Sequence, residues 1–109
     1  MMTDEQRGLF ELSVIKRLDR AKRLTGYKFL GIRSIIKKRG AVEIAKSFIG
    51  PNNTANFNGG MRMLVKVGLS DLTIEQAVID FKDTKLFSKK EAASAKKRLD
   101  TVKAFFEKK

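Results

Sequence analysis

The chain has 109 residues and a mass of 12.3 kDa, which suits one domain with a single modest hydrophobic core. Apolar residues make up 42% of it and charged residues 33%, as in folded proteins. Cysteine and histidine are absent, which excludes disulfides, the usual zinc and copper ligands, and nucleophilic sites that pair Ser or Cys with His. We therefore expect no metal, no cofactor and no enzymatic activity.

We expect neither a membrane span nor an export signal in this protein. No segment approaches the roughly 18 consecutive apolar residues of a spanning helix. The first residues, MMTDEQRG, contain no apolar stretch of the kind found in signal peptides. We expect a cytoplasmic protein with no membrane partner.

Net charge is the strongest functional signal. Lysine and arginine total 24 against 12 acidic residues, giving a formal charge of +12 and a pI near 10.2. From Lys16 to Arg39 there are ten basic residues and one acid, Asp19, a local balance of +9. Such a segment attracts polyanions, of which nucleic acid is the commonest in cells. The alternative is a hydrated surface that keeps the protein in solution, or one that docks on an acidic protein.

The first predicted helix runs from about residue 3 to Thr25. A capping box, Thr3-x-x-Gln6, opens it and Gly26 closes it. Spacings of three and four define an apolar stripe along it: Phe10, Val14, Leu18, Ala21 and Leu24. The side away from this stripe carries a basic row: Lys16, Arg20 and Arg23, with Arg17 in the same segment. The helix should bury one face and offer cations on the other.

Two further helices are predicted before residue 50. Phe29, Ile32 and Ile36 mark the apolar face of the second, with Leu30 and Ile35 close by, and Gly40 ends it. Its last turn contains three cations, Lys37, Lys38 and Arg39, which the negative end of the helix dipole favours. A short third helix ends at Gly50-Pro51, and its inward residues are Val42, Ala45, Phe48 and Ile49.

The segment from residue 50 to 60, GPNNTANFNGG, is the one clear loop and the only hinge we expect in a single domain of residues 1–109. We expect Phe57 to anchor it to the core. Together with the third helix it also permits a helix-turn-helix, in which Asn52, Asn53 and Asn56 could read adenine edges. The Gly59-Gly60 pair argues against this, because each glycine in a recognition helix costs about 1 kcal/mol relative to alanine.

A fourth helix is predicted from about Met61 to Val67, ending at Gly68, and the acidic stretch LSDLTIEQAVIDF follows it. Thr73-x-x-Gln76 is a capping box, which places Asp71 ahead of the cap and Glu75 in the first helical turn. Glu75 and Asp80 point about 140° apart on a helix, so they do not form a catalytic pair. Capping accounts for these carboxylates, and we predict that they are structural.

The last helix is opened by another capping box, Ser88-x-x-Glu91. Its predicted core stripe is Ala92, Ala95, Leu99, Val102 and Phe106. Two lysines, Lys90 and Lys97, face away from the stripe and form a further candidate basic surface. Together these elements predict an all-α fold, a compact single-domain bundle of about five to six helices.

The order of these landmarks resembles that of an uncharacterised all-helical bacterial domain, over about residues 9 to 99. The pattern is Gly-x-x-x-x-Ala-Lys, Asp-Leu-Thr-x-Glu, Leu-Phe-Ser/Thr-x-x-Glu and Ala-x-x-Arg-Leu, with aromatic residues before it and a Phe-centred loop within it. The matching residues are Tyr27, Phe29, Gly40, Ala45, Lys46, Phe57, Leu64, Gly68, Asp71, Leu72, Thr73, Glu75, Leu86, Phe87, Ser88, Glu91, Ala95, Arg98 and Leu99. The resemblance implies a helical fold and no known activity. The closing helix here is more basic than in similar domains, so a shared partner is not implied.

Two functions of different classes remain open. In the first, the protein binds DNA or RNA through phosphate contacts with little sequence reading, using Lys16, Arg17, Arg20, Arg23, Lys37, Lys38, Arg39, Lys90 and Lys97. In the second, it is an interaction module or inhibitor, for example one encoded by a phage or mobile element. It would then block a host nuclease or an immune complex such as CRISPR-Cas through a basic and partly apolar surface. The candidate protein interface is Met61, Met63 and Phe105.

Overall fold

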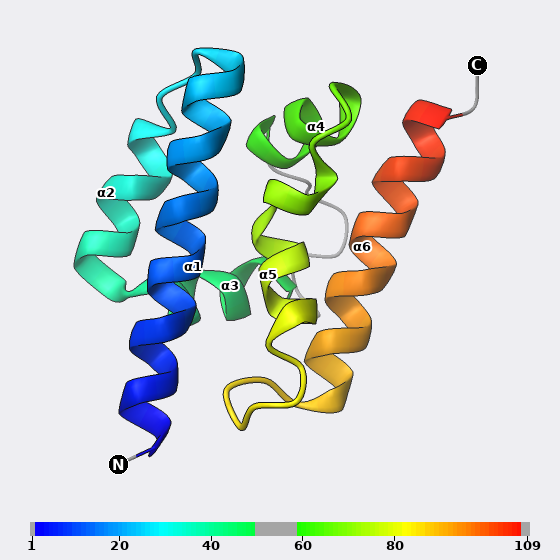
Figure 1. Cartoon of the computed structure of the whole chain (residues 1–109). Coiled ribbons are helices and arrows are strands. Elements are labelled where there is room, and N and C mark those ends of the chain that lie inside the picture. The colour runs from blue at the N-terminus through cyan, green and yellow to red at the C-terminus, as the bar shows by residue number, and fades with distance from the viewer. Residues whose placement is uncertain (1, 50–58, 108–109) are drawn as a thin grey trace.

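The computed structural model describes residues 2–49 and 59–107, and the regular secondary structure of this part of the chain is all helical (Figure 1). The described residues form six α-helices, which confirms the predicted all-α bundle. A 3-10 turn, η2, precedes α5. The elements are α1 Met2–Thr25, α2 Leu30–Arg39, α3 Ala41–Ile49, α4 Gly59–Lys66, η2 Ser70–Leu72, α5 Ile74–Asp80 and α6 Lys89–Glu107.

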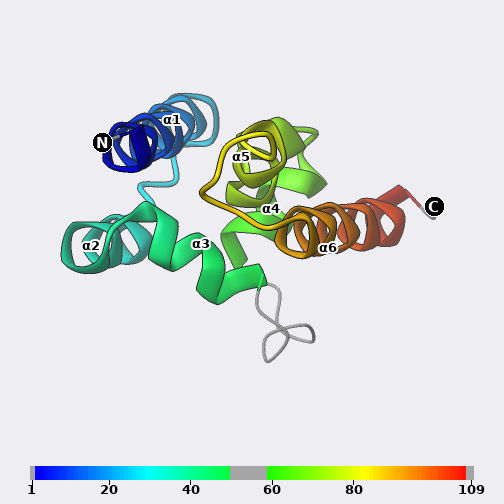
Figure 2. The same cartoon turned by 90° about the horizontal axis from the view of Figure 1, so that it is seen from below.

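The helices form two flanks around a central α5. Helices α1 and α2 run antiparallel and side by side on one flank, and α6 lies on the other flank, beyond α5 (Figures 1 and 2). Helix α3 crosses from the α1–α2 pair toward α6, and packs against α1, α2, α5 and α6. The principal extents are 47 × 29 × 21 Å. Helices α2 and α6 lie on opposite flanks, so their outer surfaces are far from each other (Figures 1 and 2).

The core is built on the predicted stripe of α1. Phe10, Val14, Leu18 and Ala21 are buried, and the Phe10 ring makes edge-to-face contacts with Phe81 and Phe87 at centroid distances of 5.2 and 5.0 Å. These contacts tie α1 to the segment that joins α5 and α6. Aromatic pairs of this geometry add to the free energy gained by burial.

Leu24 was predicted to belong to this stripe, and that prediction is wrong, since its residue surface is 55% exposed. At 100° per residue, Leu24 lies about 40° outside the sector that contains Phe10, Val14, Leu18 and Ala21. The buried face of α1 therefore ends at Ala21.

The second helix starts differently from the prediction. Phe29 is buried, but it caps α2 rather than lying within it, in a left-handed conformation with a φ of 54°. Ile36 is buried and Ile32 half-buried, as predicted, whereas Leu30 and Ile35 are 68% and 41% exposed. Phe29 thus takes the core position at the start of α2, and Leu30 is left at the surface.

Gly40 joins α2 to α3, and the residue that follows it connects this junction to α1. Its φ of 86° is one that glycine adopts without strain, and its N–H donates to the carbonyl of Ile36 at 2.8 Å. The N–H of Ala41, at the start of α3, donates to Oε1 of Glu11 at 3.0 Å. This hydrogen bond places the C-terminal end of α2 beside the N-terminal half of α1.

The capping predictions are confirmed for α6 and half confirmed for α5. Ser88 and Glu91 bond reciprocally: the N–H of Ser88 donates to Oε1 of Glu91 at 2.8 Å, and the N–H of Glu91 to Oγ of Ser88 at 3.0 Å. Oγ1 of Thr73 accepts from the N–H of Gln76 at 3.1 Å. The Gln76 side chain does not return to Thr73, because the Thr73 N–H already donates to the carbonyl of Ser70 in η2. It donates instead to Asp80 at 2.9 Å.

Several predictions fall on residues that the structure does not describe. The hinge at residues 50–58, the anchor Phe57, and the asparagines of the possible helix-turn-helix are among them, as is the side chain of the predicted cap Thr3. Helix α1 begins at Met2, one residue before that cap. Gly59 and Gly60 belong to α4, which therefore begins two residues earlier than predicted.

The described residues contain neither a membrane-spanning helix nor a cluster of metal ligands. None of the helices in residues 2–49 and 59–107 is long and apolar enough to cross a membrane. The same residues contain no group of three or more carboxylates that could hold a metal ion.

Candidate nucleic-acid interface

The basic row of α1, Lys16, Arg20 and Arg23, lies on the solvent side of that helix. All three side chains are exposed, as predicted. Within the described part of the chain none of them forms an ion pair with a carboxylate. Their charge is therefore available to an anion from outside.

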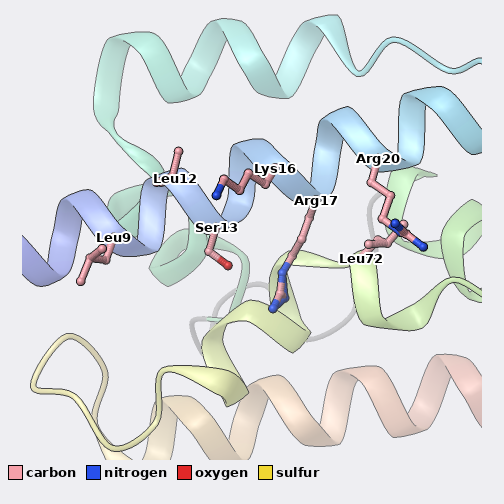
Figure 3. Close-up of a pocket in the computed structure, with 7 residues that line it drawn as sticks. All are labelled: Leu9, Leu12, Ser13, Lys16, Arg17, Arg20 and Leu72. Atoms are coloured by element: carbon pink, nitrogen blue, oxygen red, sulfur yellow. The ribbon is translucent and has the colours of Figure 1, made fainter.

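Two other arginines of the basic segment are already paired. Arg17 extends from α1 toward α5 (Figure 3), where its guanidinium pairs with the carboxylate of Asp80 and bonds to the carbonyl of Asp71. Arg33 of α2 pairs with Asp19 of α1 at 2.8 Å. Both pairs hold α1 against its neighbours. The Arg33–Asp19 pair is already counted in the +9 balance, whereas the Arg17–Asp80 pair, whose acid lies outside residues 16–39, lowers the contribution of this segment to an external field further.

One cation of α2 joins the basic row. The Arg33–Asp19 pair and the Ala41–Glu11 hydrogen bond set the register of the two antiparallel helices, so the last turn of α2 lies level with the part of α1 around Lys16. Lys37 follows Arg33 by four residues and lies on the same edge of α2. We call Lys16, Arg20, Arg23 and Lys37 the free cation set.

The remaining predicted contacts are exposed but face elsewhere. Lys38 and Arg39 advance by about 100° and 200° from Lys37 around α2, so the three charges of that last turn diverge. Lys90 and Lys97 are exposed and, by helical spacing, lie on the side of α6 away from its buried stripe. Helix α6 itself is on the opposite flank from α2 (Figures 1 and 2). The nine predicted residues therefore do not form one continuous surface.

The structure also reveals a feature of α1 that the sequence reading missed. Three leucines are about half exposed on the solvent side of α1: Leu9 at 53%, Leu12 at 49% and Leu24 at 55%. The first two border an open groove of about 350 Å³, which we call the α1 groove. Its lining residues are Leu9, Leu12, Ser13, Lys16, Arg17, Arg20 and Leu72 (Figure 3). Leu9 and Lys16, seven residues apart, could have indicated a second stripe along this helix.

The predicted protein interface is only partly available. Met63 is half-buried and packs against the main core, while the side chain of Met61 lies outside the described part. Phe105 is 74% exposed and its ring meets that of Phe106 edge to face at 5.1 Å. A small cavity of about 90 Å³ lies beside it, lined by Arg62, Thr101, Val102, Phe105 and Phe106.

Glu75 has a role beyond that of a helix-start charge, which corrects the prediction that capping explains it. Its side chain is 1% exposed, and Oε2 accepts from Nε of Arg98 on α6, itself 4% exposed, at 3.3 Å. Oε1 of Glu75 is buried without a hydrogen-bond partner in the described part. Burial raises the pKa of Glu75 above 4.5, against the opposing effects of a backbone hydrogen bond and of Arg98. The pair lies between α5 and α6 and joins these helices.

No protein family model, curated protein sequence or solved structure matches this chain. The resemblance to a helical bacterial domain therefore stays a prediction.

Proposed function

We propose that the protein binds nucleic acid through its phosphate backbone, and that the free cation set of α1 and α2 makes the contacts. The observation that carries this proposal is that Lys16, Arg20, Arg23 and Lys37 are exposed on adjacent helices and have no carboxylate partner within the described residues. Each such cation can neutralise one phosphate and release a condensed counterion. About four contacts give a slope of log affinity against log salt near −3.6 on duplex DNA.

Binding would depend little on the nucleotide sequence of the nucleic acid. The single tyrosine, Tyr27, is exposed, but its ring makes an edge-to-face contact with Phe29 at 4.7 Å. Tryptophan is absent from the sequence, and Phe10, Phe29 and Phe87 are buried in the core. Phe105 is exposed, but it belongs to α6, on the opposite flank from α1 and α2. A platform on which single-stranded bases could stack beside the free cation set is therefore not supported, and phosphate contacts to a duplex fit the surface better.

The test is fluorescence anisotropy with labelled DNA and RNA duplexes of about 20 base pairs, beginning at about 50 mM salt. We expect binding by the wild type, and a triple variant, Arg20→Glu, Arg23→Glu and Lys37→Glu, should bind more weakly with a salt slope smaller by about 2.7. A matched control changes the same amount of charge on α6 through Lys89→Glu, Lys90→Glu and Lys97→Glu. Equal loss in both variants would show that net charge, not the α1–α2 surface, determines binding.

A role as a protein-interaction module is the second candidate, and the exposed leucines of α1 favour it. Nucleic acid gains little from apolar side chains beside phosphate-binding cations, whereas a protein partner can bury them. Affinity purification with and without nuclease treatment distinguishes the two functions. A partner retained after nuclease treatment supports the interaction module, and one lost on treatment supports nucleic-acid binding.

A further inference from the structure

We infer that the α1 groove is a docking site for an acidic amphipathic helix of a partner protein. The inference rests on the interaction role and does not require that the protein bind nucleic acid. For that role, the α1 groove would be the binding site and an acidic amphipathic helix the ligand. Three observations support it: the shape of the groove, the exposed leucines and the unpaired charges beside them (Figure 3).

The shape of the surface suits a helix. Leu9, Lys16 and Arg23 recur every seven residues along the solvent side of α1, and a second helix packed alongside meets residues with this spacing once every two turns. Leu24 lies at the far end of the same side. From Leu9 to Leu24 the helix axis extends about 22 Å, the length of about four helical turns.

The apolar part of the groove lies at one end. Leu9 and Leu12 lie at this end and retain about half of their residue surface, whereas Leu72, only 5% exposed, lies beside Arg20 toward the other end, in the wall contributed by η2 (Figure 3). Ser13, which also lines the groove, adds a small polar side chain. Two leucines beside a concave surface provide a place for one or two apolar side chains of the partner.

The charges of the groove call for acidic groups in the partner. Arg17 already has Asp80 as its partner, so its charge is compensated inside the molecule. Lys16 and Arg20 line the same groove and have no carboxylate within the described residues, and Arg23 continues their row. A helix that covers these side chains must supply carboxylates, since covering an uncompensated charge is unfavourable.

Other occupants fit less well. A second copy of this chain, packed through the same face, would bring its own Lys16, Arg20 and Arg23 against the same charges, and like charges repel. A nucleic-acid duplex would pair with the cations but offer nothing apolar to Leu9 and Leu12. A membrane surface would require leucines that project beyond their surroundings, whereas here they border a groove.

The probe is a fluorescein-labelled helical peptide of about 18 residues, with leucines along one face for two turns and glutamates along the same face for the next two. We expect it to bind the wild type. The affinity of the double variant Leu9→Ser and Leu12→Ser for the peptide should be lower than that of the wild type by a factor of about ten or more. A control variant, Leu30→Ser and Ile35→Ser, removes two exposed apolar residues of α2 and should bind as the wild type does.

The same variants, tested with duplex DNA, separate this inference from nucleic-acid binding. The leucine variant should bind DNA within about twofold of the wild type, and Lys16→Glu with Arg20→Glu should weaken binding of both ligands. Thermal unfolding followed by circular dichroism confirms that each variant is folded.

Four results would overturn the inference. The first two are that the wild type does not bind the peptide, or that the leucine variant binds it as tightly as the wild type does. The third is that a peptide with glutamine in place of glutamate binds the wild type as tightly as the glutamate peptide. The fourth is that the leucine variant no longer binds DNA. Self-association of the wild type in sedimentation experiments, abolished by the leucine changes, would assign the groove to a second copy instead. Loss of binding to anionic vesicles in the leucine variant would assign it to a membrane.

Discussion

The contact between α5 and α6 and the solvent side of α1 use arginine in opposite ways. Between α5 and α6, Arg98 is 4% exposed and paired with a glutamate that is 1% exposed. On α1, Arg20 and Arg23 are exposed and have no carboxylate partner within the described residues. A basic residue therefore predicts a binding surface only when its surroundings leave the charge uncompensated.

The buried and the exposed arginines should also contribute to different properties, the first to the stability of the fold and the second to the binding of a partner. A buried ion pair loses much of its Coulomb attraction to desolvation, but removing one partner leaves a buried charge. An exposed cation contributes little to folding, since water already solvates it. Changes at Glu75 and Arg98 should therefore alter the free energy of unfolding, and changes on α1 should alter the affinity for a partner.

The largest expected effect follows from Arg98→Met, which leaves Glu75 buried without its guanidinium. We expect the free energy of unfolding to fall by about 3–5 kcal/mol at neutral pH. Urea unfolding measures this change. The double variant Glu75→Leu and Arg98→Met removes both charges and should recover most of the loss. A fall of less than about 1 kcal/mol in the single variant would mean that the pair is not isolated from water.

The next prediction concerns pH. Burial raises the native pKa of Glu75 above 4.5, so the folded protein retains this proton at pH values where the unfolded chain has released it. The stability that this group contributes is complete below pH 4.5 and is lost as the pH rises through its native pKa.

The comparison of wild type with Glu75→Gln isolates this effect. The difference in free energy of unfolding, wild type minus variant, should decrease as the pH rises from 4.5, by at most about 1.4 kcal/mol per pH unit. Urea unfolding at several pH values measures it. A difference that increases with pH would show that Arg98 outweighs burial and lowers the pKa of Glu75.

A smaller effect is expected at the start of α5. Thr73→Ala removes the hydroxyl that accepts from the N–H of Gln76 at 3.1 Å and donates to the carbonyl of Ser70 at 2.8 Å. We expect a loss of about 1 kcal/mol in the free energy of unfolding. Thr73→Ser keeps the hydroxyl and should recover most of it. If both variants lose equally, burial of the threonine methyl group, not capping, is responsible.

The smallest effect on stability is expected on α1. Leu12 is 49% exposed, so Leu12→Ser should change the free energy of unfolding by less than about 0.5 kcal/mol. Leu99→Ala, at a leucine that is 2% exposed in the predicted stripe of α6, should cost about 2–5 kcal/mol by comparison. Thermal unfolding of the two variants under one condition gives the contrast. A large loss at Leu12 would place it in the core.

Much of the fold was predictable because its signals are local. Gly26 and Gly40 end α1 and α2 in positive-φ conformations. The Ser88–Glu91 box opens α6, since both of its hydrogen bonds join residues three positions apart. The core stripe of α1 follows from helical periodicity, and the same periodicity places Leu24, three residues after Ala21, about 40° outside the buried sector.

The candidate site was only partly predictable, for the opposite reason. The sequence identified the exposed cations of α1, α2 and α6 by charge and helical spacing. It did not show that Arg17 pairs with Asp80, 63 positions away, or that α6 faces away from α2. The Glu75–Arg98 pair joins residues 23 positions apart on different helices. The acidic stretch was interpreted as a capping segment, because the sequence alone does not distinguish a carboxylate that caps a helix from one that forms a buried ion pair.

By itself, the sequence determined the helical class, most helix ends, the buried stripes and the excess of positive charge. These depend on the conformational preferences and periodicity of residues a few positions apart. Only the tertiary structure decided which cations are compensated and which leucines remain beside them at the surface. Compensation requires an opposite charge within a few ångströms, and that distance is set by the packing of helices that are remote in the chain.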